Sequence, residues 1–473
     1  MAHPIHRAQP PLEFIPQKFN PLVYYAIRGL LPLLLLLRLR PWLPTGIAKI
    51  ETVNVEVLVD LYQKFQNGKI RFLMAFRHCE VDDPLCMMHM LGYAVPKVAR
   101  QKGISLQYPT HSHFLYDRGM LLWAGDWLGW LFSRVGGLPI FRGKVDRVSL
   151  RTARDLFASG KYPISVAPEG ATNGHSESVS ALEPGVAQLS FWCVEELIKE
   201  HRAEEVLILP IGLQYRYINP RWEKLDRLLS KLEADSGLEV KRIDPSGVVN
   251  REKVFYERLF HLGEYVLSEM EKFYDRFYHQ HPRHQAATKS EDSSANPNQL
   301  LATRLEILLN RSLQAAEQYF GLEPKGTIIE RCRRIESAGW NDIYRGDLPD
   351  LKTLSPLQRG LADWIAEEAS LRMLHMRLVE SFVAVTGNYV QQKPSFERFA
   401  ETTLILFDLI ERIKGNKNPR RPRMGWRQAR LTVGEPISVT QRWSKYHENR
   451  HAAKQAVNDL TRDLQIALEN LIV

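Results

Sequence analysis

A histidine followed closely by three carboxylates lies in the N-terminal part of the chain. In the stretch FRHCEVDDPLC, residues 76–86, His78 precedes Glu80, Asp82 and Asp83. An imidazole, with an ordinary pKa of about 6.5, can take a proton from an alcohol, and a neighbouring carboxylate can hold the ring and stabilise its charged form. Because the chain has 15 histidines, the spacing from His78 to Asp83 would occur about once by chance. The surrounding elements must therefore decide between a proton-transfer pair and a polar turn.

Three further stretches have residues that suit substrate binding. A guanidinium matches a phosphate with a two-pronged hydrogen-bonding fork, and a glycine turn lets the backbone approach a ligand closely. Glu169 is expected to orient Arg142 or to accept a hydrogen bond from a substrate hydroxyl. The alternatives are a surface arginine at Arg142 and a helix cap at Asp83. The candidates lie in GGLPIFRGK, APEGATNG and PIG, and they are Gly137, Arg142, Lys144, Glu169, Gly170 and Pro210.

Buried strands are expected to position these residues. The apolar runs at 70–76, 162–168 and 205–217 are typical of strands in a parallel sheet. Helical patterns lie between them at 83–95, 147–161 and 185–201, with Asp83 as the expected N-cap of the first. This alternation predicts an α/β fold with a mostly parallel sheet flanked by helices. In such sheets, sites form beyond the carboxyl ends of the strands, and both His78 and the APEGATNG stretch follow a strand.

After residue 217 the pattern becomes helical. We expect a large all-helical insertion over 221–425, with a polar and mobile linker near 279–299. A strand at 429–439 and a helix from about 446 to 472 then return to the first domain. The expected helices of the insertion cover 221–233, 251–279, 299–319, 355–389 and 395–414. The expected segments are an N-terminal one over 1–45, an α/β domain in two parts over 46–220 and 426–473, and the insertion between those parts.

Charge and hydropathy point to a membrane surface. The formal net charge is +9, which favours an anionic partner: a membrane surface, nucleic acid or a phosphorylated substrate. The most apolar segment, 21–44, is interrupted by Arg28 and Pro32, so its longest run is too short to span a bilayer. It is either a buried packing helix or an interfacial helix with leucines in the acyl boundary. The four cysteines have no C-x-x-C spacing, so neither a zinc site nor a redox motif is indicated.

Taken in order, the polar stretches resemble the motifs of the glycerolipid acyltransferase family, whose members include the 1-acylglycerol-3-phosphate acyltransferases. VGEPISV, residues 433–439, is similar to the family's closing strand, and the resemblance covers about 45–217 and 426–473. The residues that match the four blocks are His78 and Asp83; Gly137, Ile140 and Arg142; Pro168, Glu169 and Gly170; and Pro210, Ile211 and Gly212.

The resemblance implies transfer of an acyl group from acyl-CoA or acyl carrier protein to a lysolipid acceptor at the cytoplasmic side of a membrane. It implies direct attack by the acceptor, with His78 as general base and Asp83 as its partner, and no cofactor or metal. The family's third block usually continues with Thr and a basic residue, whereas here Ala171, Thr172 and Asn173 follow. The acceptor is thus 1-acylglycerol-3-phosphate, another lysolipid or an uncharged alcohol, and Lys144 is a candidate substitute for the missing basic residue.

Other interpretations of the same residues are weaker. GGLPIFRGK lacks the spacing of a phosphate-binding P-loop and has Val145 where a P-loop needs Ser or Thr. His111 and His113 have no evident third ligand, so we expect a structural role for both. The arginine-rich stretch 419–430 is expected to face anionic lipid, and no nucleic-acid partner is expected. A catalytically silent lipid-binding or scaffold protein remains the alternative to an enzyme.

Overall fold

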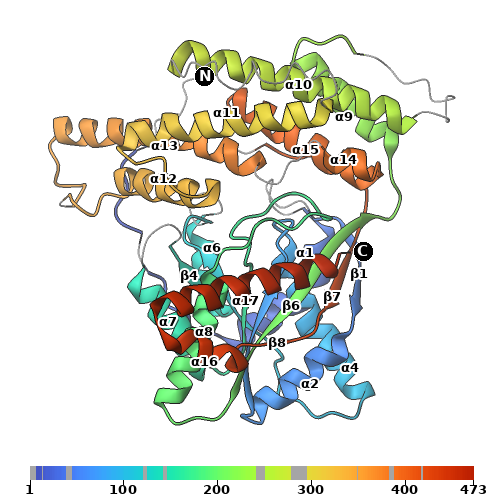
Figure 1. Ribbon diagram of the computed structural model, residues 1–473, viewed down its shortest axis with the longest axis vertical. Coiled ribbons are helices and arrows are strands. Elements are labelled where there is room, and N and C mark those ends of the chain that lie inside the picture. Colours follow the sequence, from blue (N-terminus) through green and yellow to red (C-terminus); the bar gives the residue numbers. More distant parts are fainter. Residues whose placement is uncertain are drawn as a thin grey trace. The chain divides into compact units, whose positions relative to one another are not determined.

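The contacts within the chain divide it into two compact units. The α/β unit consists of Phe14–Phe141, Val145–Pro220 and Gly425–Val473, and the helical unit is formed mainly by Arg221–Met424. Figure 1 shows the secondary structure of both units. The computed structural model describes residues 7–472 apart from 13, 39–44, 121–124, 142–145, 241–250, 279–295, 349, 383–387 and 417–418.

One mixed sheet forms the centre of the α/β unit. In the described residues its order is β1-β7-β6-β2-β5-β3-β4, and β8 pairs with β6. β6, β2, β5, β3 and β4 run parallel, whereas β7 is antiparallel to β6. This confirms the predicted α/β fold with a mostly parallel sheet. The strands are β1 (Ile47–Val53), β2 (Ile70–Phe76), β3 (His113–Asp117), β4 (Gly137–Ile140), β5 (Ile164–Val166), β6 (Glu205–Tyr217), β7 (Arg427–Val433) and β8 (Ile437–Ser438).

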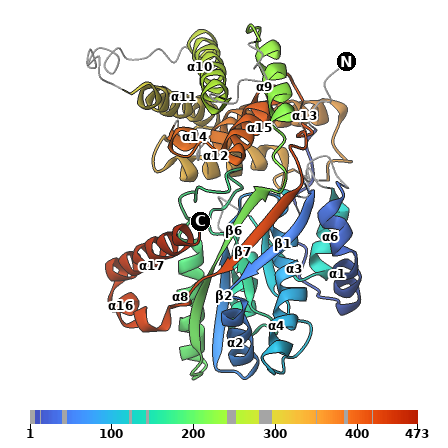
Figure 2. The same cartoon turned by 90° about the vertical axis from the view of Figure 1, so that its right-hand side faces the viewer.

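Helices cover both faces of this sheet, as Figure 2 shows. Alternate side chains of β2 point to opposite faces, so Phe72 and Met74 join one core and Leu73 and Ala75 join the other. The continuous apolar run of β2 is thus explained by burial on two sides. On the first face lie α1 (Pro21–Leu36), α2 (Val55–Gln66), α3 (Asp83–His89) and α4 (Val95–Gln101); on the second lie α7 (Arg147–Ser159), α8 (Gly185–Lys199) and α17 (Arg450–Asn470).

The helical unit confirms the predicted all-helical region. Its α12 begins with a capping box in which Thr327 and Glu330 bond reciprocally, a start signal that we did not predict. The described helices are α9 (Trp222–Asp235), α10 (Arg251–Tyr278), α11 (Pro297–Phe320), α12 (Ile328–Ile343), α13 (Pro356–Phe382), α14 (Asn388–Gln392) and α15 (Phe396–Ile413).

Several expected boundaries differ from the structure. Of the expected linker 279–299, residues 279–295 lie outside the described part, and Pro297 already begins α11. The expected helix 355–389 corresponds to α13 and α14, with 383–387 outside the described residues. The strand at 429–439 is two strands, β7 and β8. No described helix has the length and apolar character needed to cross a bilayer.

Candidate active site

His78 lies two residues after the end of β2, and its ring contacts the carboxylate of Asp83. The distance from His78 Nδ1 to Asp83 Oδ2 is 3.0 Å. Because a carboxylate only accepts hydrogen bonds, Nδ1 donates and Nε2 is the basic nitrogen. The side chain of His78 is 22% exposed, whereas that of Asp83 is fully buried. The geometry thus brings together the two residues that the sequence paired, with the basic nitrogen left for a substrate.

Two further groups hold the Asp83 carboxylate. The hydroxyl of Tyr215 on β6 donates to Oδ1 at 2.6 Å, and the backbone N–H of Glu80 donates to Oδ2 at 2.9 Å. Three donors around one buried carboxylate fix its orientation and stabilise its charge. The expectation that Asp83 is the helix N-cap is wrong, because α3 begins at Asp83 and the preceding Asp82 takes the N-cap position without a capping bond.

Asp82 is buried beside Asp83 but points to a different partner. Its Oδ2 accepts from the backbone N–H of Thr45 at 2.8 Å and from the guanidinium of Arg427, the first residue of β7. Burial raises the pKa of Asp82 to about 6, although Arg427 opposes this shift. The guanidinium of Arg427 also stacks on the Tyr215 ring, 4.6 Å from its centroid. Asp82 is therefore occupied by a structural ion pair, and Asp83 is the carboxylate that serves His78.

Glu169 follows β5, the strand next to β2, and it holds the backbone of His78. Its Oε1 accepts from the His78 N–H at 2.9 Å, and its Oε2 accepts from the Ser180 N–H at 3.0 Å and from Asn173 Nδ2 at 3.2 Å. Burial raises the pKa of Glu169, and the nearby Arg77 opposes the shift. The described contacts give Glu169 a positioning role, and a contact with an acceptor stays a prediction.

Arg77, which the sequence analysis did not single out, binds the backbone of residues 175–178, in the segment that follows Glu169. Its guanidinium is fully buried and donates to the backbone carbonyls of His175, Ser176 and Ser178. Arg77 and His78 are consecutive, so the residue that ties down this segment is joined directly to the candidate base. An arginine immediately after a buried strand is expected to be buried as well, and its charge then requires partners. This position of Arg77 is the sequence signal that could have predicted the network.

The predicted binding residues that the structure describes lie near the strand ends in different settings. Gly137 begins β4, and an added Cβ would come within 2.9 Å of Phe114 Cζ, so internal packing requires this glycine. Gly170 has a φ of 71°, the left-handed region that favours glycine. Pro210 is buried within β6 opposite Ala75.

Arg142 and Lys144, the two candidate phosphate-binding residues, lie outside the described residues. Their expected contacts with an acceptor therefore stay predictions. Residues 142–144, which end the stretch GGLPIFRGK after its glycine turn, all lie outside the described part.

The remaining histidines and cysteines of interest are structural. His111 is buried, its Nε2 donates to the Val135 carbonyl at 2.9 Å, and burial lowers its pKa to about 3. Burial lowers the pKa of His113 to about 4. The cysteines Cys79, Cys86, Cys193 and Cys332 are free and buried. No group of metal-binding side chains occurs among the described residues.

Helix α1 packs against the core with one side and exposes leucines on the other. Its Leu31 and Leu35 are buried in the core of the α/β unit. On its other side Leu22 and Leu33 are exposed, by 80% and 54%. The residues before α1 bond to the end of α6 (Asp126–Arg134), through the Lys18 N–H and the Ser133 carbonyl. The packing role of this segment is thus confirmed for α1, and its interfacial role stays a prediction; residues 39–44 lie outside the described part.

The arginine-rich stretch 419–430 differs from the expected lipid-facing patch. Arg427 is buried and paired with Asp82, and Arg421 pairs with Asp408 at 2.7 Å. These two charges serve internal contacts. The expectation was wrong for the buried Arg427, because the sequence does not reveal which acidic residue approaches from a distant segment; for the rest of the stretch it stays a prediction.

Comparisons of the chain with protein-family models, curated proteins and solved structures find no match.

Proposed function

We propose that this protein is an acyltransferase that moves a fatty acyl group from a thioester donor to a hydroxyl of a glycerolipid-type acceptor. The donor is acyl-CoA or acyl carrier protein, and the first candidate acceptor is 1-acylglycerol-3-phosphate. The observation that carries the proposal is the 3.0 Å contact between His78 Nδ1 and Asp83 Oδ2, at the carboxyl end of β2. The resemblance of the surrounding motifs to the glycerolipid acyltransferases supports it.

In the proposed reaction, Nε2 of His78 takes the proton of the acceptor hydroxyl while the oxygen attacks the thioester carbonyl. The new C–O bond forms, the C–S bond breaks, and the imidazolium returns the proton to the departing thiolate. Asp83 stabilises the imidazolium between these steps, and Tyr215 keeps the carboxylate in place. The transfer balances without an oxidant, a metal or a covalent acyl-enzyme.

Peripheral binding to the cytoplasmic side of a membrane is part of this proposal. The exposed leucines of α1 and the exposed Trp127 and Trp130 of α6 support it, because both side-chain types partition into the membrane interface. Deleting 21–36 would also remove Leu31 and Leu35 from the core, so point changes are the better test. Leu22→Gln with Leu33→Gln should shift the protein from the membrane pellet to the supernatant. An unchanged distribution would favour a packing role alone.

Incubation of the purified protein with labelled palmitoyl-CoA and a panel of lysolipids tests the activity. The proposal predicts a labelled diacyl product from at least one acceptor, and the silent alternative predicts none with either donor. The free thiol of CoA should appear in equal amount to the ester. Thiol release without ester would indicate thioester hydrolysis instead.

Arg142 separates a phosphorylated acceptor from an uncharged alcohol. With a phosphate-bearing acceptor, Arg142→Ala should raise the acceptor KM about ten- to a hundredfold, because a charge-assisted contact is lost. Arg142→Lys should recover only part of the loss, since an ammonium lacks the two-pronged geometry. The donor KM should hardly change. An unaltered acceptor KM in Arg142→Ala would favour the non-phosphorylated acceptor.

A further inference from the structure

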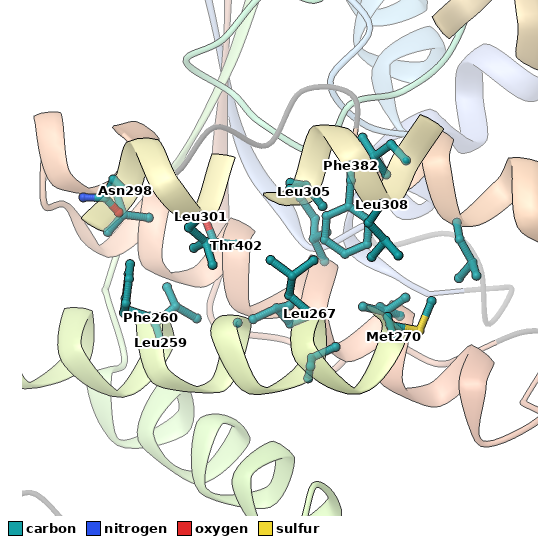
Figure 3. Close-up of a pocket in the computed structure, with 18 of the residues that line it drawn as sticks. Leu259, Phe260, Leu267, Met270, Asn298, Leu301, Leu305, Leu308, Phe382 and Thr402 are labelled. Atoms are coloured by element: carbon teal, nitrogen blue, oxygen red, sulfur yellow. The ribbon is translucent and has the colours of Figure 1, made fainter. Parts of the chain in front are cut away.

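The helical unit contains an apolar cavity between α10, α11, α13, α14 and α15 (Figure 3). The space between its lining atoms amounts to about 990 Å³, a figure that includes the open mouth. The residues that line it have no charged side chain, and the polar ones are Tyr256, Asn298, Ser312 and Thr402. A buried charge without a partner is costly, so the cavity suits an apolar and uncharged ligand segment.

Two of the helices that line the cavity, α10 and α11, run side by side in the same direction. Tyr256 bonds to Asn298, Glu271 to Arg304 and Asp275 to Arg311, so positions ascend together on α10 and α11. The apolar part of the lining on α10, beyond Tyr256, extends from Leu259 to Met270, which at 1.5 Å per residue corresponds to about 16 Å. This is about half of the ~30 Å hydrocarbon core of a bilayer, and hence about the reach of one acyl chain.

The two ends of the cavity differ in polarity. At one end, Tyr256, Asn298 and Gln391 form a neutral hydrogen-bonded cluster, with Asn298 Nδ2 2.6 Å from Gln391 Oε1. Met270 and Phe382 lie toward the other end, as Figure 3 shows. An acyl chain attached to a neutral polar group has the same asymmetry.

Two positions in the lining are unusual for a cavity that stays empty. Gly263 lies within the long helix α10, where glycine is unfavourable, yet an added Cβ would meet nothing within 4 Å. The buried Thr402 hydroxyl has no hydrogen-bond partner among the described residues. Protein interiors are otherwise closely packed, and a void loses the dispersion contacts of its lining. The open space beside Gly263 is explained if a ligand lies along α10.

From these observations we infer that the helical unit binds a single long-chain fatty acyl group, with the neutral polar end of the ligand at Asn298 and the chain running along α10 toward Met270. The inference does not depend on the acyl transfer proposed for His78, because no residue of that site lines this cavity. Each can therefore fail without the other.

Equilibrium binding of labelled palmitate and of monopalmitoylglycerol to the full-length protein tests the inference. Both should bind saturably, at one molecule per chain, and the neutral ester should bind at least as tightly. Gly263→Phe should fill the cavity and weaken binding by at least about tenfold. Gly360→Phe is the matched control, since Gly360 is also helical, is exposed and has open space around it. His78→Ala should leave binding unchanged.

Wild-type affinity in a folded Gly263→Phe variant would overturn the inference. Should that variant fail to fold, photo-crosslinking of the wild-type protein with a diazirine-bearing palmitate decides instead. Label on peptides of α10, α11 or α15 supports the cavity as the site. Label confined to peptides from 14–141 or 145–220 would show that the chain binds in the α/β unit and would overturn the inference.

Discussion

Both units bury charged side chains, but they use them differently. In the α/β unit Arg77, Asp83 and Glu169 converge on one histidine at neighbouring strand ends. In the helical unit the buried charges join helices in pairs: Arg258 on α10 bonds to Glu233 on α9, and Arg331 on α12 bonds to Glu317 on α11. The cavity lining stays free of charge. Burial of charge alone therefore does not indicate a reactive site; the proposed function rests on the convergence of these groups on a partly exposed histidine.

The largest expected effect short of removing His78 itself concerns the carboxylate that serves this histidine. Asp83→Asn should lower kcat by about a hundredfold or more, because an amide cannot stabilise the imidazolium and permits the wrong tautomer. The loss should stay below that of His78→Ala. Asp82→Asn, measured where the protein is folded, should change kcat much less. A greater loss in Asp82→Asn than in Asp83→Asn would show that the partner is wrongly assigned.

The ion pairs of the two units can be compared directly. Arg427→Ala and Arg331→Ala each leave a buried carboxylate without its partner and should each lower the free energy of unfolding by about 3–5 kcal/mol. At a temperature low enough for both variants to be folded, only Arg427→Ala should also reduce kcat, because Asp82 adjoins Asp83. Urea unfolding with parallel rate assays tests this. Equal losses of kcat in both variants would contradict a site restricted to the α/β unit.

Acid should destabilise the helical unit through His375. Burial lowers the pKa of His375 to about 4, and its Nδ1 lies 2.6 Å from the Tyr274 hydroxyl. The unfolded chain binds a proton below a pH of about 6.5 and the folded chain only near pH 4, so stability falls as the pH drops through this window. We expect a loss of about 3 kcal/mol from this group. His375→Gln should show a smaller loss between pH 7 and pH 4; an identical pH profile would exclude His375 as the cause.

The smallest expected effect is a gain in stability at the cavity. Gly263→Ala should raise the free energy of unfolding of the ligand-free protein by about 0.5–1 kcal/mol, because alanine restricts the unfolded chain and favours the helix. Gly360→Ala should give a similar gain. Thermal unfolding of both variants without lipid measures this. A destabilised Gly263→Ala would mean that the space beside Gly263 is not open.

The sequence predicted those elements whose signal is local. β2 and β6 are continuous apolar runs and have the predicted bounds. The sheet brings His78 and Glu169 together because β2 and β5 are parallel neighbours, as strand-end reasoning requires. β1 was missed because it pairs only with β7 at the edge and most of its residues are partly exposed, so its apolar pattern is weak.

Tyr215 and Arg427 could not be predicted, because they reach the site through long-range pairing. Tyr215 lies opposite Ala429 in the register of β6 and β7, and no local pattern encodes that pairing. The adjacent pair Asp82 and Asp83 does indicate that a distant cation is needed. Only one carboxylate can serve His78, so a buried second one requires a cation from elsewhere in the chain.

The most direct test of the central claim compares wild-type protein with His78→Ala in the transfer of a labelled palmitoyl group from palmitoyl-CoA to a lysolipid acceptor. With His78 as general base, the variant should lose about a thousandfold or more in kcat, while its thermal unfolding midpoint and its binding of palmitate stay unchanged. Wild-type turnover by a folded His78→Ala protein would contradict the account.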